Sequence, residues 1–225
     1  MLEFIPYEEY DGLTNMAVDV ALLDKSIENG LLPALRLYGW SKPTVTIGRN
    51  QNISGINQEY CKKHNIDIVK RPTGGRALLH DMELTYSFIC SVGFLKDGNS
   101  VIKSYKEISE ALIISFTKVG ISFTFPQYKK VDVKNGYCMA ISTGSDLNFK
   151  GKKIIGSAQF RKQNYILQHG SILMDINYDT LTGIFGNKGL DDNVTTLKEI
   201  NPDIMDINVL SKAIKAGFEE KFFND

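Results

Sequence analysis

Three segments between residues 146 and 173 are rich in β-forming residues and follow one another with only short breaks. They cover residues 146–149, 153–160 and 165–173, and Lys150-Gly151 has the composition of a tight hairpin turn between the first two. Strands joined by such short turns pair antiparallel. This run therefore commits the chain to a sheet with neighbouring antiparallel strands, around which the other elements must be arranged.

Helices and further strands are predicted from the spacing of apolar residues. One helix is expected over Asn15–Leu23 with Thr14 as its N-cap, and a longer one after Ser100 that ends at Gly120. Shorter helices are expected at residues 57–64 and 178–184, and a further one at 209–222. The remaining strands are expected at residues 35–38, 45–47, 66–70, 84–92 and 121–125.

The order of these elements predicts the fold class. Strands come in clusters with helices between them, which is typical of an α+β protein with a mixed, mainly antiparallel β-sheet flanked by helices. A chain of 225 residues without a linker-like segment is long enough for one large core. We therefore expect a single domain over residues 1–225, with a smaller C-terminal subregion from about residue 177 as the alternative.

Charge and cysteine content limit the class of function. The 26 basic and 26 acidic residues balance, so nothing predicts a nucleic-acid or membrane partner. Three widely spaced cysteines, Cys61, Cys90 and Cys138, favour neither a disulfide framework nor a C-x-x-C zinc site. The acidic N-terminal segment lacks the apolar region of a signal peptide. We expect a protein of the cytoplasm.

The segment from Arg71 to Asp81 holds the first group of candidate binding residues. Gly74 and Gly75 allow a close backbone approach to a ligand, and Arg71 and Arg76 can offer planar donors to a carboxylate or phosphate. Taken alone, two glycines between strands are more often a simple turn.

Two later segments add further candidates. Lys152 and Lys153 open a strand that continues with the small residues Gly156, Ser157 and Ala158 followed by Gln159, which leaves room for a ligand against the sheet. His169 and Gly170 interrupt an apolar strand. A lysine pair is usually a solvated hairpin and a lone strand histidine usually a core residue, so each signal is weak by itself.

Together these segments resemble the lipoate/biotin protein ligase superfamily. Residues 71–81 resemble its R-R-x-T-G-G-x-A-x-x-H-D signature, residues 151–159 its G-x-K-I-x-G-x-A-Q strand, and residues 169–173 its H-G-S-x-L strand. Similar matches occur, in the family's order, at residues 15–19, 35–40, 47–51 and 195–199. The resemblance implies an acyl-binding pocket lined by Arg71, Thr73, Gly74, Gly75, Arg76, Ala77, His80, Gly156, Ser157, Ala158, Gln159, His169 and Gly170.

Two further residues point to one branch of the superfamily. Cys138 lies fifteen residues before Lys153, a spacing similar to that of the catalytic pair in the cysteine-lysine octanoyltransferases acting on the glycine-cleavage H protein. Arg76 stands where many ATP-dependent ligases have a third glycine. The resemblance thus implies Cys138 as nucleophile and Lys153 as its cationic partner. Because Met139 follows Cys138 where the family often has Phe, a bystander cysteine remains the alternative.

The resemblance implies an enzyme, a protein N-octanoyltransferase of lipoate biosynthesis. It would move octanoyl from acyl carrier protein, through a cysteine thioester, to a lysine of a lipoyl-domain protein such as glycine-cleavage H protein. No metal and no cofactor is expected for this route. Three alternatives stay open: an ATP-dependent lipoate-protein ligase, for which ATP and Mg would be required, a lipoyl amidotransferase between carrier proteins, and a non-catalytic binding module.

Overall fold

Two β-sheets form the centre of the protein, seen in a computed structural model that describes residues 1–30, 33–126, 146–186 and 193–224. The six-stranded sheet has the order β1-β2-β6-β9-β8-β7 and the three-stranded sheet the order β4-β3-β5. Strands β1–β2 and β3–β4 pair parallel and the other neighbours antiparallel, which confirms the mixed, mainly antiparallel sheet. The larger sheet comprises β1 (Glu3–Tyr10), β2 (Ala34–Trp40), β6 (Glu83–Ser91), β7 (Leu147–Phe149), β8 (Lys152–Lys162) and β9 (Tyr165–Leu173), and the smaller β3 (Thr44–Ile47), β4 (Asp67–Lys70) and β5 (Leu78–His80).

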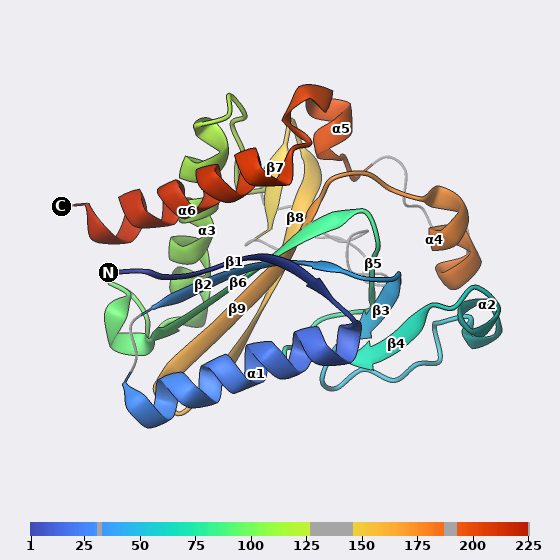
Figure 1. The fold of residues 1–225 in the computed structure, drawn as a ribbon, viewed down its shortest axis with the longest axis horizontal. Helices are drawn as coiled ribbons and strands as arrows, with labels where there is room; N and C mark the ends of the chain where they lie inside the picture. The colour runs from blue at the N-terminus through green and yellow to red at the C-terminus, as the bar shows by residue number, and fades with distance from the viewer. Residues whose placement is uncertain (31–32, 127–145, 187–192, 225) are drawn as a thin grey trace.

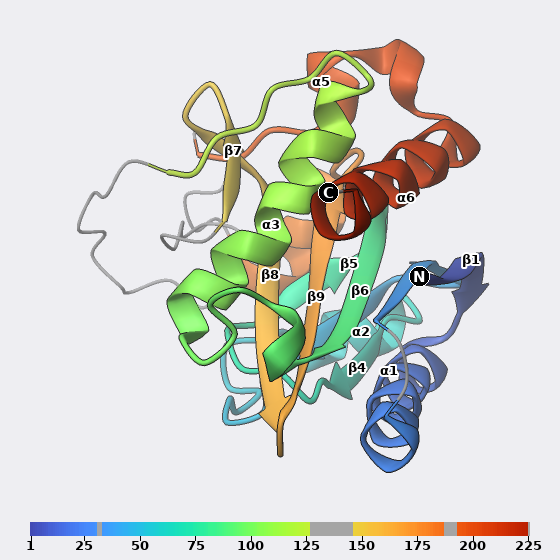
Figure 2. The ribbon, with the colours of Figure 1, turned by 90° about the vertical axis from the view of Figure 1, so that its left-hand side faces the viewer.

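Helices cover both faces of the larger sheet, as Figures 1 and 2 show from two directions. Helix α1 lies on one face, and α3 and α6 lie together on the other, whereas α2 and α4 flank the smaller sheet (Figure 1). No helix among the described residues is long and apolar enough to cross a membrane. The helices are α1 (Gly12–Asn29), α2 (Gln58–Lys63), α3 (Val101–Thr117), α4 (Tyr178–Phe185), α5 (Leu197–Ile200) and α6 (Ile207–Phe223), with 3₁₀ turns at Val92–Phe94 and Pro202–Ile204.

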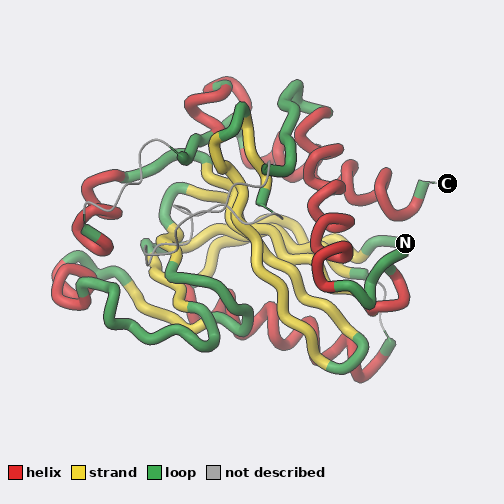
Figure 3. The backbone as a smooth tube through the Cα atoms, turned by 180° about the vertical axis from the view of Figure 1, so that it is seen from behind, coloured by secondary structure: helices red, strands yellow, loops and turns green. Residues whose placement is uncertain are grey.

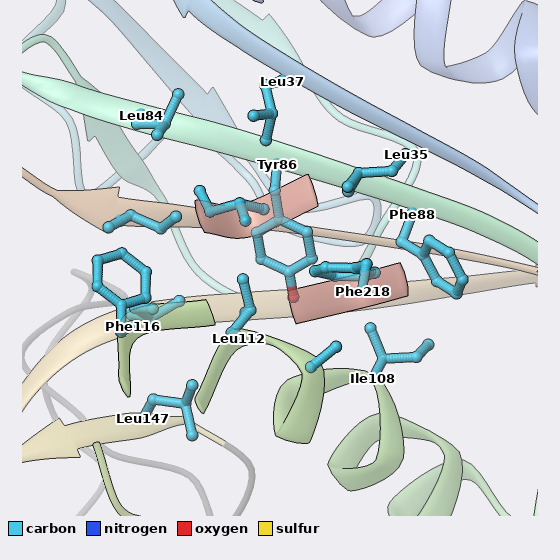
Figure 4. Packing of buried hydrophobic residues seen from close by; sticks show 14 of the residues in the cluster. Leu35, Leu37, Leu84, Tyr86, Phe88, Ile108, Leu112, Phe116, Leu147 and Phe218 are labelled. Atoms are coloured by element: carbon cyan, nitrogen blue, oxygen red, sulfur yellow. The ribbon is translucent and has the colours of Figure 1, made fainter. Parts of the chain in front are cut away.

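The main hydrophobic core fills the space between the sheet and helices α3 and α6. Figure 4 shows Tyr86 and Phe88 of β6 pointing toward Phe218 of α6 and Leu112 of α3. Because side chains alternate along a strand, the neighbouring residues Thr85 and Ser87 face the opposite side of the sheet. One face of β2 and β6 thus supplies the core, and the other is left for α1 and the smaller sheet.

The predicted hairpin between β7 and β8 is confirmed. Phe149 pairs with Lys152, so the turn has two residues, Lys150 and Gly151, with φ of 48° and 84°. Positive φ at both positions gives the backbone a twist that suits antiparallel strands. This turn leads directly into β8, the strand that carries several candidate site residues.

Several local predictions were wrong or incomplete, and the short elements β5 and α5 were not predicted. Helix α1 begins at Gly12 and is capped by Asp11, whose carboxylate accepts from the Thr14 N–H at 2.9 Å, and not by Thr14. Of residues 121–125 only Thr124 pairs, in an isolated bridge to Asn148. Strand β1 was missed, because it is an exposed edge strand broken by Pro6 and a bulge. The tube in Figure 3 shows both termini on the same side of the molecule.

Candidate active site

A cavity lies at the junction of the two sheets, on the face of β2 and β6 opposite the main core. It holds about 380 Å³ of space not occupied by atoms, its open mouth included. Seven predicted site residues line it: Arg71, His80, Gly156, Ser157, Ala158, His169 and Gly170. The other described lining residues are Met16, Tyr38, Trp40, Thr46, Leu78, Thr85 and Ser171.

The remaining predicted pocket residues lie around the cavity and not in its described lining. The glycine loop, residues 73–76, is hydrogen-bonded to the Arg71 side chain. Ala77 is buried in the hydrophobic cluster of the smaller sheet. Gln159 lies on the other face of the larger sheet, where its Nε2 donates to Gln168 Oε1 at 3.1 Å and to Ser104 Oγ at 3.4 Å. Small residues of β8 therefore border the cavity, whereas the larger Gln159 side chain points away from it.

Arg71, the first residue after β4, fixes the shape of the glycine loop. Its Nη2 donates to the carbonyl oxygens of Gly74 and Arg76 at 2.8 and 2.7 Å, and its Nε donates to Thr73 Oγ1 at 3.1 Å. Its Nη1 donates to the carbonyl and hydroxyl oxygens of Thr46, both at 3.1 Å. A guanidinium presents five N–H donors in a rigid fork, so Arg71 can hold several loop oxygens at once. Arg71 therefore lines the cavity and also fixes the conformation of the loop beside it.

Gly75 is the loop position that tolerates a side chain least. Its φ is +93°, and a Cβ would lie 2.7 Å from Arg71 Nη2. We expect Gly75→Ala to lower the free energy of unfolding by about 1–3 kcal/mol, measured by chemical denaturation. Gly74→Ala is the matched control, because a Cβ there meets nothing within 4 Å. Equal losses in both variants would contradict this account of the loop.

His169 of β9 is held between a buried carboxylate and the glycine loop. Its Nδ1 lies 3.1 Å from Asp19 Oδ2 and its Nε2 lies 2.8 Å from Thr73 Oγ1. Asp19 also accepts from Arg36 Nη1 at 2.9 Å and from the Tyr38 hydroxyl at 3.0 Å. Burial alone would raise the pKa of Asp19, but His169 and Arg36 together lower it below the usual value. Asp19 is therefore an anion at neutral pH.

His80 of β5 has an equivalent set of neighbours. Its Nδ1 lies 3.0 Å from Glu83 Oε1, its Nε2 lies 2.9 Å from Thr46 Oγ1, and its ring stacks on Trp40 at 4.0 Å between centroids. Burial lowers the pKa of His80 more than the Glu83 carboxylate raises it. The imidazole that faces the cavity is therefore neutral at pH 7.

Lys153 forms a buried ion pair at the start of β8. Its Nζ lies 2.9 Å from Asp146 Oδ2, and both side chains are 2% exposed. Its backbone also pairs with the segment that precedes α5: the Lys153 N–H donates to the Asn193 carbonyl at 2.8 Å, and the Lys153 carbonyl accepts from the Thr195 N–H at 2.9 Å. Lys153 is not among the described lining residues, but it precedes Gly156 by three residues, about 10 Å along a strand.

The predicted nucleophile, Cys138, lies outside the described residues. The two cysteines that the structure describes are both buried. Burial raises the pKa of Cys61, and it raises the pKa of Cys90 to about 12. Neither thiol is suited to act as a thiolate at neutral pH. Among the described residues no group of three or more His, Cys, Asp or Glu side chains could hold a metal ion.

Sequence reasoning missed the acidic partners of both histidines. Asp19 had a detectable signal: it lies three residues after Met16 and four before Leu23, on the buried face of α1. A charged residue on the apolar stripe of a helix indicates a buried partner. Glu83 and Thr46 gave no comparable signal, because Glu83 reads as an ordinary residue at a strand end and Thr46 as an ordinary residue within a strand.

Comparison with known proteins identifies the family of this chain. A family profile described as the lipoyl protein ligase A/B catalytic domain matches residues 11–219. Octanoyltransferase LipM of Carboxydothermus hydrogenoformans is 33% identical over 230 residues, which cover 97% of this chain and 86% of that protein. Octanoyltransferase LipM of Bacillus subtilis is 36% identical over 223 residues, which cover 91% and 80%.

A solved structure shares the fold as well. The crystal structure of lipoate-protein ligase A bound with ATP has a TM-score of 0.80 and 25% identity, and the match covers 98% of this chain and 85% of that one. The family resemblance expected from the sequence motifs is thereby confirmed. The chain belongs to the lipoyl protein ligase A/B catalytic-domain family and is an enzyme of acyl transfer.

Proposed function

We propose that this enzyme is a protein N-octanoyltransferase of lipoate biosynthesis. The observation that carries the proposal is the cavity between the sheets, with apolar walls such as Met16, Trp40 and Leu78 and a glycine loop behind Arg71. Such a site suits a medium-length acyl chain, since burying each methylene contributes about 0.8 kcal/mol. The relatives from Carboxydothermus and Bacillus, both named octanoyltransferases, support the same substrate.

The proposed donor is octanoyl-acyl carrier protein, and the first step is thioester exchange. The Cys138 thiolate attacks the thioester carbonyl carbon, the bond from that carbon to the pantetheine sulfur breaks, and the carrier thiolate leaves and takes up a proton. Because Cys61 and Cys90 have raised pKa values, Cys138 is the cysteine best suited to this role. The ammonium of Lys153, held by Asp146, would stabilise the thiolate and the oxyanion.

The proposed acceptor is a lysine of a lipoyl-domain protein such as glycine-cleavage H protein. Its neutral ε-amine attacks the acyl carbon, the bond to the Cys138 sulfur breaks, and loss of a proton from nitrogen leaves an amide. The thiolate of Cys138 is regenerated. This route needs neither ATP nor a metal ion, in contrast to an acyl-adenylate route.

The second candidate is an ATP-dependent lipoate-protein ligase, which the similarity to a ligase structure with bound ATP favours. A lipoyl amidotransferase would use the same thioester chemistry with a lipoyl-protein donor. The deciding experiment supplies the full chain and an acceptor lipoyl domain with octanoyl-acyl carrier protein, with free octanoate plus Mg-ATP, or with an octanoylated carrier domain. We expect transfer from the acyl carrier protein thioester without ATP.

Intact mass spectrometry then tests the covalent step. The wild-type enzyme mixed with the donor alone should gain the mass of one octanoyl group, and Cys138→Ser should gain none. Cys61→Ala serves as the control and should be acylated like the wild type. Transfer that requires Mg-ATP and persists in Cys138→Ser would replace this proposal with the ligase.

A further inference from the structure

Two hydrogen-bond chains of the same composition meet at Arg71. One runs from Asp19 through His169 to Thr73, with separations of 3.1 and 2.8 Å. The other runs from Glu83 through His80 to Thr46, with separations of 3.0 and 2.9 Å. The hydroxyl of each threonine lies 3.1 Å from an Arg71 nitrogen. The first chain runs from α1 through β9 to the glycine loop, and the second from β6 of the larger sheet through β5 to β3 of the smaller.

The ends of each chain limit where its protons can lie. A guanidinium only donates hydrogen bonds and a carboxylate only accepts them. Each threonine oxygen therefore accepts from Arg71, and its own hydrogen is free to point to the histidine Nε2. When that nitrogen accepts, the imidazole proton is on Nδ1 and points to the carboxylate, and every donor in the chain meets an acceptor. A threonine oxygen has two lone pairs and could also accept from a protonated Nε2, so the protonation of each ring is the quantity to measure.

We propose that Asp19 and Glu83 are positioning residues, which act through His169 and His80 to hold Arg71 and, with it, the glycine loop that borders the acyl cavity. Both histidines are then hydrogen-bond bridges in the neutral, Nδ1-protonated form. Since both of their Nε2 lone pairs are engaged by threonine hydroxyls, neither imidazole takes the proton of the incoming amine. Only the identity of the acyl group in this inference rests on the proposed function.

The protonation pattern is directly measurable in the wild-type enzyme. The sequence has three histidines, so a long-range ¹H–¹⁵N spectrum of histidine-labelled protein at pH 7.5 resolves each ring. We expect His80 and His169 as neutral Nδ1–H forms, whereas the exposed His64 serves as an internal reference. An Nε2–H or a doubly protonated ring at His80 or His169 would overturn the inference, whatever the enzyme's substrate proves to be.

Paired substitutions in each chain separate the hydrogen bonds from simple packing. Thr73→Val removes the hydroxyl and should lower kcat/KM for transfer about 100-fold, the effect of a misplacement of about 1 Å at a reacting centre. Thr73→Ser keeps the hydroxyl and should restore near wild-type kcat/KM. Equal losses in both variants, or wild-type activity in Thr73→Val, would show that the hydroxyl is not needed.

The second pair replaces Glu83. Glu83→Leu removes the acceptor and should release His80 from its Nδ1–H form and lower kcat/KM. Glu83→Gln should rescue both, because its carbonyl oxygen can accept from His80 and Thr85 as Glu83 Oε1 does. A Glu83→Leu enzyme with wild-type activity and an unchanged His80 spectrum would overturn the assignment. If that variant does not fold, the Glu83→Gln spectrum and the Thr73 pair still decide the question.

Discussion

Replacing Lys153 with methionine is expected to lower the free energy of unfolding by about 3–5 kcal/mol and to abolish octanoyl transfer. Lys153 and Asp146 are both 2% exposed and 2.9 Å apart. Without the ammonium, the Asp146 carboxylate would stay in the interior without the cation that lies 2.9 Å from it, which is the costly half of a buried ion pair. Urea denaturation measures the stability, and the carrier-dependent assay measures the transfer.

A double variant separates the structural role of Lys153 from its proposed chemical role. Lys153→Met combined with Asp146→Leu removes both charges and keeps an apolar filling of similar size, so most of the lost stability should return. Transfer should not return, because the ammonium of Lys153 that we propose to stabilise the thiolate and the oxyanion would be missing. If the double variant regained wild-type activity, Lys153 would be a purely structural residue.

Replacing Arg71 with lysine is expected to have the second-largest effect. The guanidinium serves two carbonyl oxygens of the glycine loop, two threonine hydroxyls and the carbonyl of Thr46. A lysine has three N–H groups at one point and cannot reach this set. Because each buried acceptor left without a donor costs about 1–3 kcal/mol, we expect a loss of about 2–4 kcal/mol and a fall in kcat/KM of at least about 100-fold.

Hydrogen exchange provides the local readout for this variant. The Arg49 N–H donates to the Thr73 carbonyl at 2.8 Å, so its exchange rate reports whether the glycine loop keeps its place. Exchange should speed up in Arg71→Lys. The exposed Arg49→Lys is the control for the same change of residue type, and it should alter stability by less than about 0.5 kcal/mol. An unchanged exchange rate of the Arg49 N–H in Arg71→Lys would mean that the glycine loop keeps its conformation without the Arg71 guanidinium.

The elements that local sequence describes well were predicted closely. Strand β9 matches its predicted range of residues 165–173, and α3 begins after Ser100, whose hydroxyl caps it as expected. Both have long periodic patterns with clear end signals. Strand β1 has neither, because its side chains are largely exposed and Pro6 interrupts it. Its place in the sheet depends on pairing with β2, which no local pattern encodes.

The candidate site divides in the same way. The glycine loop and the residues Gly156, His169 and Gly170 could be selected because unusual residues occur together in short segments. Their connection could not be predicted, since Asp19 and His169 are 150 positions apart and meet only through the packing of α1 on β9. The role of Arg71 also needed the structure: its sequence context suggested a ligand donor, whereas the hydrogen bonds described above go to the glycine loop and to Thr46.

The cavity is bounded by two sheets that meet through hydrogen bonds, and this affects how the protein could be redesigned. The contacts of His80 with Glu83 and of His169 with Thr73 link the larger sheet to the smaller sheet and its glycine loop at close to 3 Å. Substitutions that change the packing of apolar side chains elsewhere should leave these hydrogen bonds in place. The main core lies on the opposite face of the same strands. A library that varies core residues such as Phe88 should therefore shift the melting temperature while leaving chain-length preference alone, and substrate range should respond to changes at Leu78 or Met16.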